Sequence, residues 1–361
     1  MVIKMKIAVI GGGNIGTLMA AEFSAKGFET SIYSSRNNGK KRVEVYDNDD
    51  NYLFTSNELL ITNDIDLAIN DAKVVFVTYP PELFDKLSHE LDGKLSNGTC
   101  LGIVPGSGGA EFAFNNLIKQ GVTLFGLQRV HSIARIKEIG KSVYMLGRKE
   151  SISISVFKNE NVEFIKEFLQ DSLDMPCHVL DNYLTITLSP SNQILHTTRL
   201  CMLFNDYRFG DSYPENILFY KTWDDKSSDL MIKCDEELQI LCDKISFDLK
   251  DVKSLKDHYE SHSVEAMTEK ISNIPAFQEL TSPMLENDEN EWVPDFNSRY
   301  FSSDFPFGLK IILDIANLYG TPTEHLSYVW NWFFELAKPK VCFNLEKYGI
   351  ESIDEFENYY K

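Results

Sequence analysis

The sequence predicts a two-domain α/β protein in which a doubly wound parallel sheet precedes a mainly helical domain. Three observations predict this architecture. An apolar strand runs into a glycine-rich turn at residues 6–16, strands and helices alternate through the first half, and helical patterns dominate from Pro190 onward. Apolar strands without alternation, each followed by a helix, are typical of parallel sheets covered on both faces. The 361-residue chain is long enough for two cores, and we expect the domains at residues 1–182 and 183–361.

The first strand and its turn form a phosphate-binding pattern. Residues 6–16 read KIAVIGGGNIG, so the strand ends in Gly11-x-Gly13-x-x-Gly16. In such a motif the first glycine makes a tight turn, the second admits a pyrophosphate, and the third lets the next helix pack on the strand. That helix, expected at Thr17 to Lys26, also offers unpaired N–H groups to an anion. The pattern predicts a Rossmann-type dinucleotide site, whose cofactor-binding candidates are Gly11, Gly13, Asn14, Ile15 and Gly16.

The end of the second strand, expected at Glu29 to Tyr33, is predicted to select the cofactor. An NAD site usually has an acidic residue there, which binds the ribose hydroxyls. This chain instead has Ser34, Ser35 and Arg36, with further basic residues at positions 40–42. Hydroxyls and a forked guanidinium can hold the extra phosphate of NADP, which a carboxylate would repel. We therefore expect NADP as the preferred cofactor, with NAD as the alternative.

Later strands of the first domain are expected to bring more residues to the same sheet edge. Strands are expected at Val74–Val77, Thr99–Val104, Val122–Leu127, Val143–Leu146 and Ile152–Val156, and helices at Pro81–Leu91, Ala110–Gln120 and Val162–Leu173. Ligands bind at the carboxyl ends of such strands. Tyr79, Pro105 and Gly106 follow two of these ends and become cofactor-binding candidates. Arg129 follows a third and becomes a substrate-binding candidate, with Arg135 expected near the same edge.

The second domain is expected to be built from helices, because its apolar residues recur at helical spacing. The expected ranges are Gln193–Phe204, Asp229–Phe247, Ser254–Lys270, Gly308–Tyr319 and Thr323–Leu336, with an acidic surface loop at Met284–Asp295.

The composition is that of a soluble globular protein with a strong negative charge. The 54 acidic and 35 basic side chains give a net charge of −19, which argues against nucleic acid and anionic membranes as partners. No apolar run approaches the ~18 residues that span a bilayer. Six scattered cysteines without C-x-x-C pairing indicate free thiols in a reducing compartment. We expect a cytoplasmic protein without a metal site; the sequence leaves the oligomeric state open, a homodimer being one option.

Two segments of the second domain carry residues suited to acid–base chemistry. His196 lies among polar residues in SPSNQILHTTR, at the start of the first expected helix. Arg299 and Asp304 lie in SRYFSSDFPFGL, residues 298–309. Each segment also has a plain structural interpretation, because a lone histidine is commonly satisfied in a core and Asp304 fits a helix cap. His131 is a weaker candidate, and the other histidines fit core or surface roles.

Four motifs taken together resemble those of the octopine/nopaline dehydrogenase family, the opine dehydrogenases. They are the glycine fingerprint, PGSGGAEF at residues 105–112, the histidine of NQILHTTR, and the R-Y-x-x-x-D-x-P-x-G-L run. Their order along both domains is similar to that of the family. The resemblance implies a Rossmann domain followed by a helical domain. It also implies an enzyme that couples an amino acid to a 2-oxo acid and reduces the resulting imine with NAD(P)H.

The resemblance further implies a role for each candidate in the second domain. His196 would be the catalytic acid/base, Asp304 the carboxylate that orients it, and Arg299 the cation that holds the oxo-acid carboxylate. Imidazole can take up and return a proton near neutral pH, and a carboxylate on its other nitrogen fixes the tautomer. Gln193 and Arg129 are further substrate-binding candidates. The histidine lacks its usual flanking prolines, and Ser303 replaces the usual acid before the aspartate, so the substrates stay open.

Two other functions stay open on the sequence. One is a ketopantoate-reductase-like or other 2-hydroxy-acid dehydrogenase, although such enzymes tend to use a lysine on the first helix of the second domain. This chain has His196 and Arg199 there, and no lysine. The other is a non-catalytic NADP(H) sensor, which does not require His196 and Asp304 to meet. The negative charge weakly favours a cationic amino acid as substrate, but the sequence does not identify either substrate.

Overall fold

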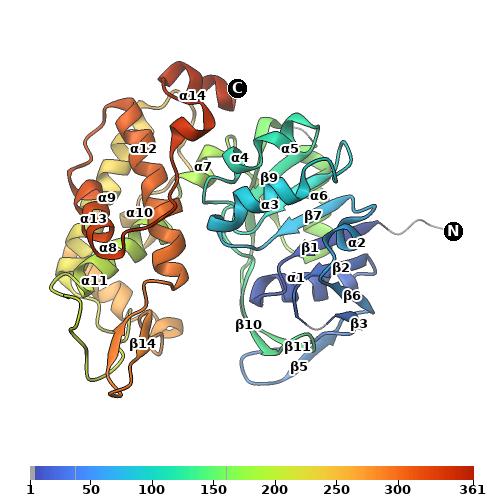
Figure 1. Cartoon of the computed structure of the whole chain (residues 1–361), viewed down its shortest axis with the longest axis horizontal. Helices are drawn as coiled ribbons and strands as arrows, with labels where there is room; N and C mark the ends of the chain where they lie inside the picture. Colours follow the sequence, from blue (N-terminus) through green and yellow to red (C-terminus); the bar gives the residue numbers. More distant parts are fainter. Residues whose placement is uncertain (1–4, 37, 160) are drawn as a thin grey trace. The chain divides into compact units, whose positions relative to one another are not determined.

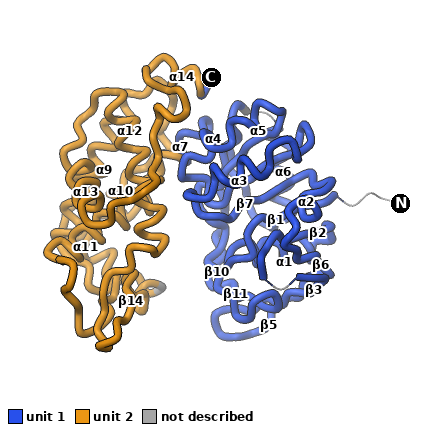
Figure 2. The backbone as a smooth tube through the Cα atoms, viewed as in Figure 1, with its two compact units in different colours: residues 1–186, 360 blue, residues 187–359, 361 orange. Residues whose placement is uncertain are grey.

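The computed structural model describes residues 5–36, 38–159 and 161–361. The chain divides into two compact units, shown in blue and orange in Figure 2. The first comprises residues 1–186 with Tyr360, and the second comprises residues 187–359 with Lys361. Residues 1–4 of the expected first domain lie outside the described ranges. The division falls within the short helix α7 (Leu184–Thr187), whereas the sequence placed it after residue 182.

A nine-stranded sheet organises the first unit (Figure 1), in the order β13-β12-β9-β8-β7-β1-β2-β6-β3. Its strands are β1 (Lys6–Ile10), β2 (Glu29–Tyr33), β3 (Gly39–Lys41), β6 (Leu59–Thr62), β7 (Val74–Val77), β8 (Cys100–Ile103), β9 (Thr123–Leu127), β12 (Ile152–Val156) and β13 (Cys177–Val179). The central strands β6, β2, β1, β7, β8 and β9 are mutually parallel. Because the order runs outward from β1 in both directions, the sheet has the predicted Rossmann-type, doubly wound topology.

Continuous apolar sequence explains why the central strands are buried on both faces. β7 reads VVFV, and all four residues are buried. Phe76 of β7 packs against Phe23 of α1 (Asn14–Ala25) and Phe168 of α6 (Val162–Leu173), with ring centroids 5.0 and 6.3 Å apart. These rings fix α1, whose N-terminus follows the glycine turn, against the sheet. The remaining helical segments of this unit are α2 (Ile65–Ile69), η1 (Pro81–Leu83), α3 (Phe84–Leu91), α4 (Ala110–Ala113), α5 (Asn115–Lys119) and η2 (Phe157–Asn159).

The margins of the main sheet depart from a purely parallel arrangement. β12 pairs antiparallel with β9, and β3 pairs antiparallel with β6.

A separate four-stranded sheet, which was not predicted, has the order β10-β11-β4-β5. Its strands are β4 (Glu44–Tyr46), β5 (Tyr52–Thr55), β10 (Ser132–Glu138) and β11 (Ser142–Arg148). The expected strand at Val143–Leu146 belongs to this sheet. Arg135 lies within β10, so its expected position at the edge of the main sheet is wrong.

The second unit is mainly helical, as predicted. Its segments are η3 (Ser191–His196), α8 (Thr197–Leu203), α9 (Asp225–Lys244), α10 (Leu255–His258), α11 (Val264–Ser272), η4 (Pro275–Phe277), η5 (Tyr300–Leu309), α12 (Lys310–Tyr319), α13 (Glu324–Ala337), η6 (Leu345–Tyr348) and α14 (Ile353–Tyr360). None of the helices in the described ranges is long and apolar enough to cross a membrane.

Two predicted elements of the second unit are wrong in detail. The single helix expected at Ser254–Lys270 is broken into α10 and α11, because Glu260 has a positive φ of 52° and Ser263 caps a new helix start. The loop expected at Met284–Asp295 contains a small hairpin of β14 (Met284–Glu286) and β15 (Trp292–Pro294). Its strands are only three residues long, which is too short for a recognisable alternating pattern.

Candidate functional site

The glycine turn of the first unit is held by contacts that leave no room for side chains at two positions. Gly11 has φ +119°, and a Cβ atom there would lie 2.4 Å from Oγ1 of Thr78. A Cβ on Gly16 would lie 1.9 Å from the carbonyl oxygen of Gly11. The Thr78 hydroxyl donates to the carbonyls of Ile10 and Gly11, at 3.3 and 3.2 Å. Gly11 and Gly16 are therefore required by the turn itself, and Thr78, which the sequence did not single out, braces it.

Gly13 differs from its neighbours because the described protein gives it no packing reason to be glycine. It caps α1 with φ −83°, and a Cβ there would meet nothing within 4 Å. Gly13 and Asn14 are exposed, and no side chain caps the helix N-terminus. Asn14 accepts a hydrogen bond from the Ile136 amide at 2.8 Å, which ties the turn to β10. Exposed helix N–H groups beside an open glycine fit the pyrophosphate of a dinucleotide.

The segment after β2 has the polar, exposed character expected of a phosphate-binding loop. Ser34 is half-buried, while Ser35 and Arg36 are exposed. The Ser34 hydroxyl accepts from the Arg36 amide at 3.2 Å, which turns the chain. Within the described part of the chain, the Arg36 guanidinium makes no hydrogen bond or ion pair. It is therefore available to an anionic ligand.

The other predicted cofactor residues of the first unit divide between the turn and the sheet. The Tyr79 ring lies against the glycine turn, 3.3 Å from where a Gly11 Cβ would be. Pro105 follows β8 and is half-buried. Gly106 is packed inside, since a Cβ there would lie 2.8 Å from Cα of Gly126. Its carbonyl also accepts from the Tyr183 hydroxyl at 3.0 Å, so its glycine identity has a packing reason.

Arg129 and His131 lie close together in sequence after β9 but differ in setting. Arg129 is half-buried, two residues past the strand end. His131 is fully buried, and its Nε2 lies 2.6 Å from a carboxylate oxygen of Glu22 on α1. Arg148 binds the other oxygen of Glu22 at 2.5 Å. His131 is thus part of an internal ionic cluster, and its weaker candidacy for the active site gives way to a structural role.

His196 and Asp304 meet inside the second unit, although 108 residues separate them. Nδ1 of His196 lies 2.8 Å from Oδ2 of Asp304, and both side chains are about nine-tenths buried. The Tyr300 ring packs on the imidazole with centroids 4.6 Å apart. Asp304 lies inside η5 and does not cap a helix. The alternative of a plain cap is therefore wrong, and the pair has the geometry of a carboxylate-oriented imidazole.

Both residues lie in π-helical segments, His196 at the end of η3 and Asp304 within η5. Such wide turns are frequent at functional sites, because they displace side chains from regular helical positions. The two segments touch at Gly308, where a Cβ would lie 2.7 Å from Cβ of Gln193. Gln193 itself is buried, and its amide donates to the carbonyls of Thr187 and Ser189. Its observed contacts therefore hold the chain in place before His196.

Arg299 immediately precedes η5 and is exposed. Among the described residues it has no hydrogen-bond or ion-pair partner.

Tyr220 contacts the second ring nitrogen of His196, with its hydroxyl 3.2 Å from Nε2. Sequence reasoning missed Tyr220, because no motif spacing marks it. The described residues contain no group of three or more histidine, cysteine or acidic side chains placed to hold a metal ion.

Two family models match the chain, one in each unit. Residues 179–337 match the description "NAD/NADP octopine/nopaline dehydrogenase, alpha-helical domain". Residues 6–120 match the N-terminus of NAD-dependent glycerol-3-phosphate dehydrogenase. The two matches fall on the helical unit and on the glycine-turn unit, respectively.

Whole-chain comparisons agree with this division. Tauropine dehydrogenase of Arabella iricolor is 25% identical over 296 residues, covering 76% of this chain and 73% of the relative. Octopine dehydrogenase of Mizuhopecten yessoensis is 23% identical over 357 residues, covering 91% and 89%. A solved octopine dehydrogenase with NADH and L-arginine shares the fold, with a TM-score of 0.83, 20% identity and 98% coverage of each chain. Residues 179–337 thus carry the helical domain of the octopine/nopaline dehydrogenases, which are NAD- or NADP-dependent oxidoreductases, and the chain is similar to opine dehydrogenases over most of its length.

Proposed function

We propose that the protein is an NADPH-dependent opine dehydrogenase, which joins an amino acid to a 2-oxo acid through an imine and reduces that imine. The observation that carries the proposal is the buried contact between His196 and Asp304 at 2.8 Å. A buried imidazole paired with a carboxylate has the two properties that an acid/base needs, a fixed orientation and a stabilised charged form.

His196 would perform the proton transfers of the condensation. It takes a proton from the substrate ammonium, so that the free amine can attack the oxo carbon. It then gives a proton to the carbinolamine oxygen, which leaves as water and produces the imine. Asp304 holds the imidazole in the Nδ1–H tautomer and stabilises the imidazolium between the two transfers. A nicotinamide cofactor, when bound, would supply the hydride for the imine carbon.

Arg299 would bind the carboxylate of the 2-oxo acid. Arg299 is exposed and has no partner among the residues that the structure describes, which supports this role, because a guanidinium without a carboxylate partner can form a bidentate pair with the substrate. Arg129 and Gln193 stay predictions as substrate-binding residues. Gln193 is the weaker of the two, since its amide already donates to two backbone carbonyls.

The proposed preference for NADPH rests on the loop after β2. An exposed serine and an exposed arginine, which has no partner in the described ranges, follow the strand where an NAD enzyme would carry an acid. Arg36→Ala is expected to weaken NADPH binding about tenfold and leave NADH binding unchanged, the loss of one charged hydrogen-bond pair. Equal losses of affinity for both nucleotides would contradict the preference.

Cytoplasmic location and a homodimer also stay predictions from the sequence.

The decisive experiment follows NADPH oxidation with purified protein. Oxidation is expected only when both an amino acid and a 2-oxo acid are present, with pyruvate and 2-oxoglutarate tested against the common amino acids. Asp304→Asn is expected to lower turnover by about 10³-fold or more while nucleotide binding is kept, because the imidazole loses its orienting charge. Asp288→Asn, an exposed acid of the same unit, is the matched control.

Each alternative function has its own result in this assay. Oxidation with the 2-oxo acid alone would favour a 2-hydroxy-acid dehydrogenase. Tight NADPH binding that no pair of substrates converts to turnover, and that Asp304→Asn leaves unchanged, would favour a sensor. The absence of lysine from α8, which reads TTRLCML, argues against a ketopantoate-reductase-like mechanism.

A further inference from the structure

The second nitrogen of His196 has a partner that sequence reasoning missed. The Tyr220 hydroxyl lies 3.2 Å from Nε2, and both residues are buried, with exposed fractions of 6% and 7%. Asp304 is acceptor-only when ionised, so Nδ1 of His196 carries the proton that they share. Neutral imidazole then has a lone pair on Nε2, and the phenol is the group with a proton to donate.

We propose that Tyr220 is a positioning residue for the acid/base: its hydroxyl donates to Nε2 of neutral His196 and holds that nitrogen ready to accept a proton. The inference rests on the proposed function, in which Nε2 exchanges protons with the substrate. Once Nε2 is protonated, the same hydroxyl oxygen can accept from it, so Tyr220 can serve both states by rotation of its proton. Burial raises the pKa of Tyr220 well above its usual value, which keeps the hydroxyl protonated.

Stacked rings fix the position of the Tyr220 hydroxyl. The Tyr220 ring stacks on Phe277 with centroids 4.6 Å apart and on Trp223 at an interplanar angle of 11°. Phe219, its chain neighbour, packs edge-on against the imidazole itself. A phenol held between two rings keeps few rotamers, so its hydrogen bond to Nε2 costs little further ordering.

A buried arginine holds the chain segment that carries Tyr220. Arg199 lies three residues after His196 and is 2% exposed. Its Nε donates to the Phe219 carbonyl at 3.0 Å, and Nη2 donates to the carbonyl and hydroxyl of Thr222 at 2.8 and 2.7 Å. These contacts bracket Tyr220 on both sides along the chain. The helical stretch of η3 and α8 therefore carries both the imidazole of His196 and Arg199, which holds the segment of its partner Tyr220.

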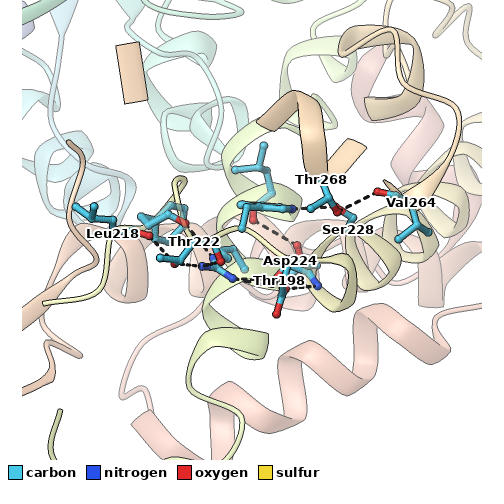
Figure 3. A network of polar contacts seen from close by, with 12 residues as sticks. Thr198, Leu218, Thr222, Asp224, Ser228, Val264 and Thr268 are labelled. Carbon is cyan, nitrogen blue, oxygen red and sulfur yellow. Dashed lines mark hydrogen bonds and ion pairs between the residues drawn. The ribbon is translucent and has the colours of Figure 1, made fainter. Parts of the chain in front are cut away.

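The polar network around Thr222 and Asp224 continues to Ser228 and Thr268, as Figure 3 shows. Nη1 of Arg199 donates to the Ser227 hydroxyl at 3.0 Å, and Asp224 lies 3.6 Å from the same nitrogen. Asp224 also accepts from the Ser227 amide and caps α9. The indole of Trp223 donates to Ser228, which bonds Thr268 of α11. The segment that carries Tyr220 is therefore anchored to α8, α9 and α11.

Few ionisable groups face this imidazole in the described part of the chain. Asp304 and Tyr300 face it from η5, and Tyr220 faces it from the segment before α9. Tyr259, after α10, acts electrostatically on Tyr220 together with Tyr300 and Asp304. Arg199 of α8 donates its hydrogen bonds to the 219–227 segment. Within the described residues, Tyr220 is the group that contacts Nε2, so the ¹⁵N signal of that nitrogen reports on the Tyr220 contact.

The test compares the wild type with Tyr220→Phe, which keeps the stacked ring and removes only the hydroxyl. The hydrogen bond from the hydroxyl polarises the Nε2 lone pair of neutral imidazole, so its loss changes the shielding of that nitrogen. We expect the ¹⁵N signal of Nε2 in neutral His196 to move toward that of an imidazole nitrogen without a hydrogen bond. Tyr213→Phe removes a hydroxyl from a half-buried tyrosine elsewhere in the unit and should leave the signal in place.

Two outcomes would overturn the inference. One is an Nε2 ¹⁵N signal that does not move in Tyr220→Phe while the melting temperature shows that the variant is folded. The other is a ¹⁵N spectrum of the wild type in which neutral His196 carries its proton on Nε2, since the hydrogen bond would then run the opposite way. Both readouts use the free protein. A failed search for opine substrates would therefore contradict the proposed function without touching this result.

Discussion

Gly13 and Gly16 lie three residues apart in one turn, yet the structure gives them opposite reasons for being glycine. At Gly16 the reason is internal, because a Cβ would lie 1.9 Å from a backbone oxygen. At Gly13 the protein leaves open space and an ordinary φ of −83°. A glycine that the fold does not need is explained by a ligand whose phosphates approach the backbone.

The two positions should therefore respond differently to alanine. Gly16→Ala is expected to destabilise the protein by about 1–3 kcal/mol or more, because backbone must move. Gly13→Ala is expected to lower stability by about 1 kcal/mol or less and to weaken NADPH binding about tenfold or more. Urea unfolding and nucleotide titration by fluorescence check both. Unchanged NADPH affinity in Gly13→Ala would contradict the proposed position of the pyrophosphate.

Sequence reasoning found the residues of the candidate site that lie in a recognisable motif. It missed those whose role depends only on a contact with a distant segment. The glycine fingerprint has a fixed spacing, and His196, Asp304 and Arg299 came from a resemblance that spans both domains. Tyr220 and Thr78 have no such spacing, because each acts through a contact with a distant segment. His131 shows the same limit, since its partner Glu22 lies 109 residues away.

At the scale of elements, the meeting of η3 and η5 depends on one glycine. Gly308 of η5 faces Gln193 of η3, with 2.7 Å between a Cβ on Gly308 and Cβ of Gln193. Gly308→Ala is expected to cost about 1–3 kcal/mol of stability by forcing the segments apart. It should also lower turnover, because the same segments carry His196 and Asp304. Gly147→Ala, whose Cβ would meet ordinary contacts at 3.5 Å, is the control in urea unfolding and kinetic assays.

A buried ionic cluster links α1 to β11 and to His131, the residue before β10, and makes the first unit sensitive to acid. Burial raises the pKa of Glu22, but the charges and hydrogen bonds of His131 and Arg148 outweigh it and leave the pKa below its usual 4.5. The folded protein therefore binds fewer protons at Glu22 than the unfolded chain does. The contribution to stability is complete above pH 4.5 and is lost as the pH falls through the lowered pKa.

Glu22→Gln tests this sign directly. At pH 7 the variant is expected to be less stable by about 1–3 kcal/mol, because buried donors of Arg148 and His131 lose a charged acceptor. The difference from wild type should shrink as the pH falls through the lowered pKa of Glu22, where the wild-type carboxyl also becomes neutral. Glu163→Gln, on the surface of α6, should change stability by less than about 0.5 kcal/mol throughout. A difference that grows in acid would contradict the assignment.

The elements that sequence reasoning predicted and missed differ in burial. β7 was predicted residue for residue, because VVFV is buried on both faces and reads as a continuous apolar run. β3 reads GKK and is mostly exposed, and β5 reads YLFT without a buried residue. Such strands exist because neighbours in the same sheet pair with them, which is tertiary information that propensity does not contain.

At the scale of the whole molecule, the two-unit organisation was predictable because the apolar residues follow a different sequence pattern in each unit. Strands followed by helices fill the first, and helical spacing fills the second. The sequence places the boundary after residue 182, where the strand-and-helix pattern ends, and the division into compact units falls slightly later, inside α7. Of the second sheet only the strand at Val143–Leu146 was predicted, and the short, partly exposed strands β4 and β5 were missed for the same reason as β3.

The net charge of −19 makes a prediction about the entire chain. Self-repulsion destabilises a compact state, and raising NaCl from 10 to 150 mM shortens the screening length from about 30 to about 8 Å. If screening restores about 1 kcal/mol, the melting temperature should rise by about 2–4 °C. Exposed ion pairs such as Lys86–Glu90 are screened too, but each contributes little.

The control for this prediction replaces NaCl with tetramethylammonium chloride at the same concentrations. Screening depends on ionic strength and not on the identity of the cation, so calorimetry should show the same rise with both salts. A rise with sodium alone would indicate a specific cation site instead. A fall with both salts would mean that the ion pairs of the folded state outweigh the repulsion among 54 acidic side chains, and that the excess charge is arranged so that it does not oppose folding.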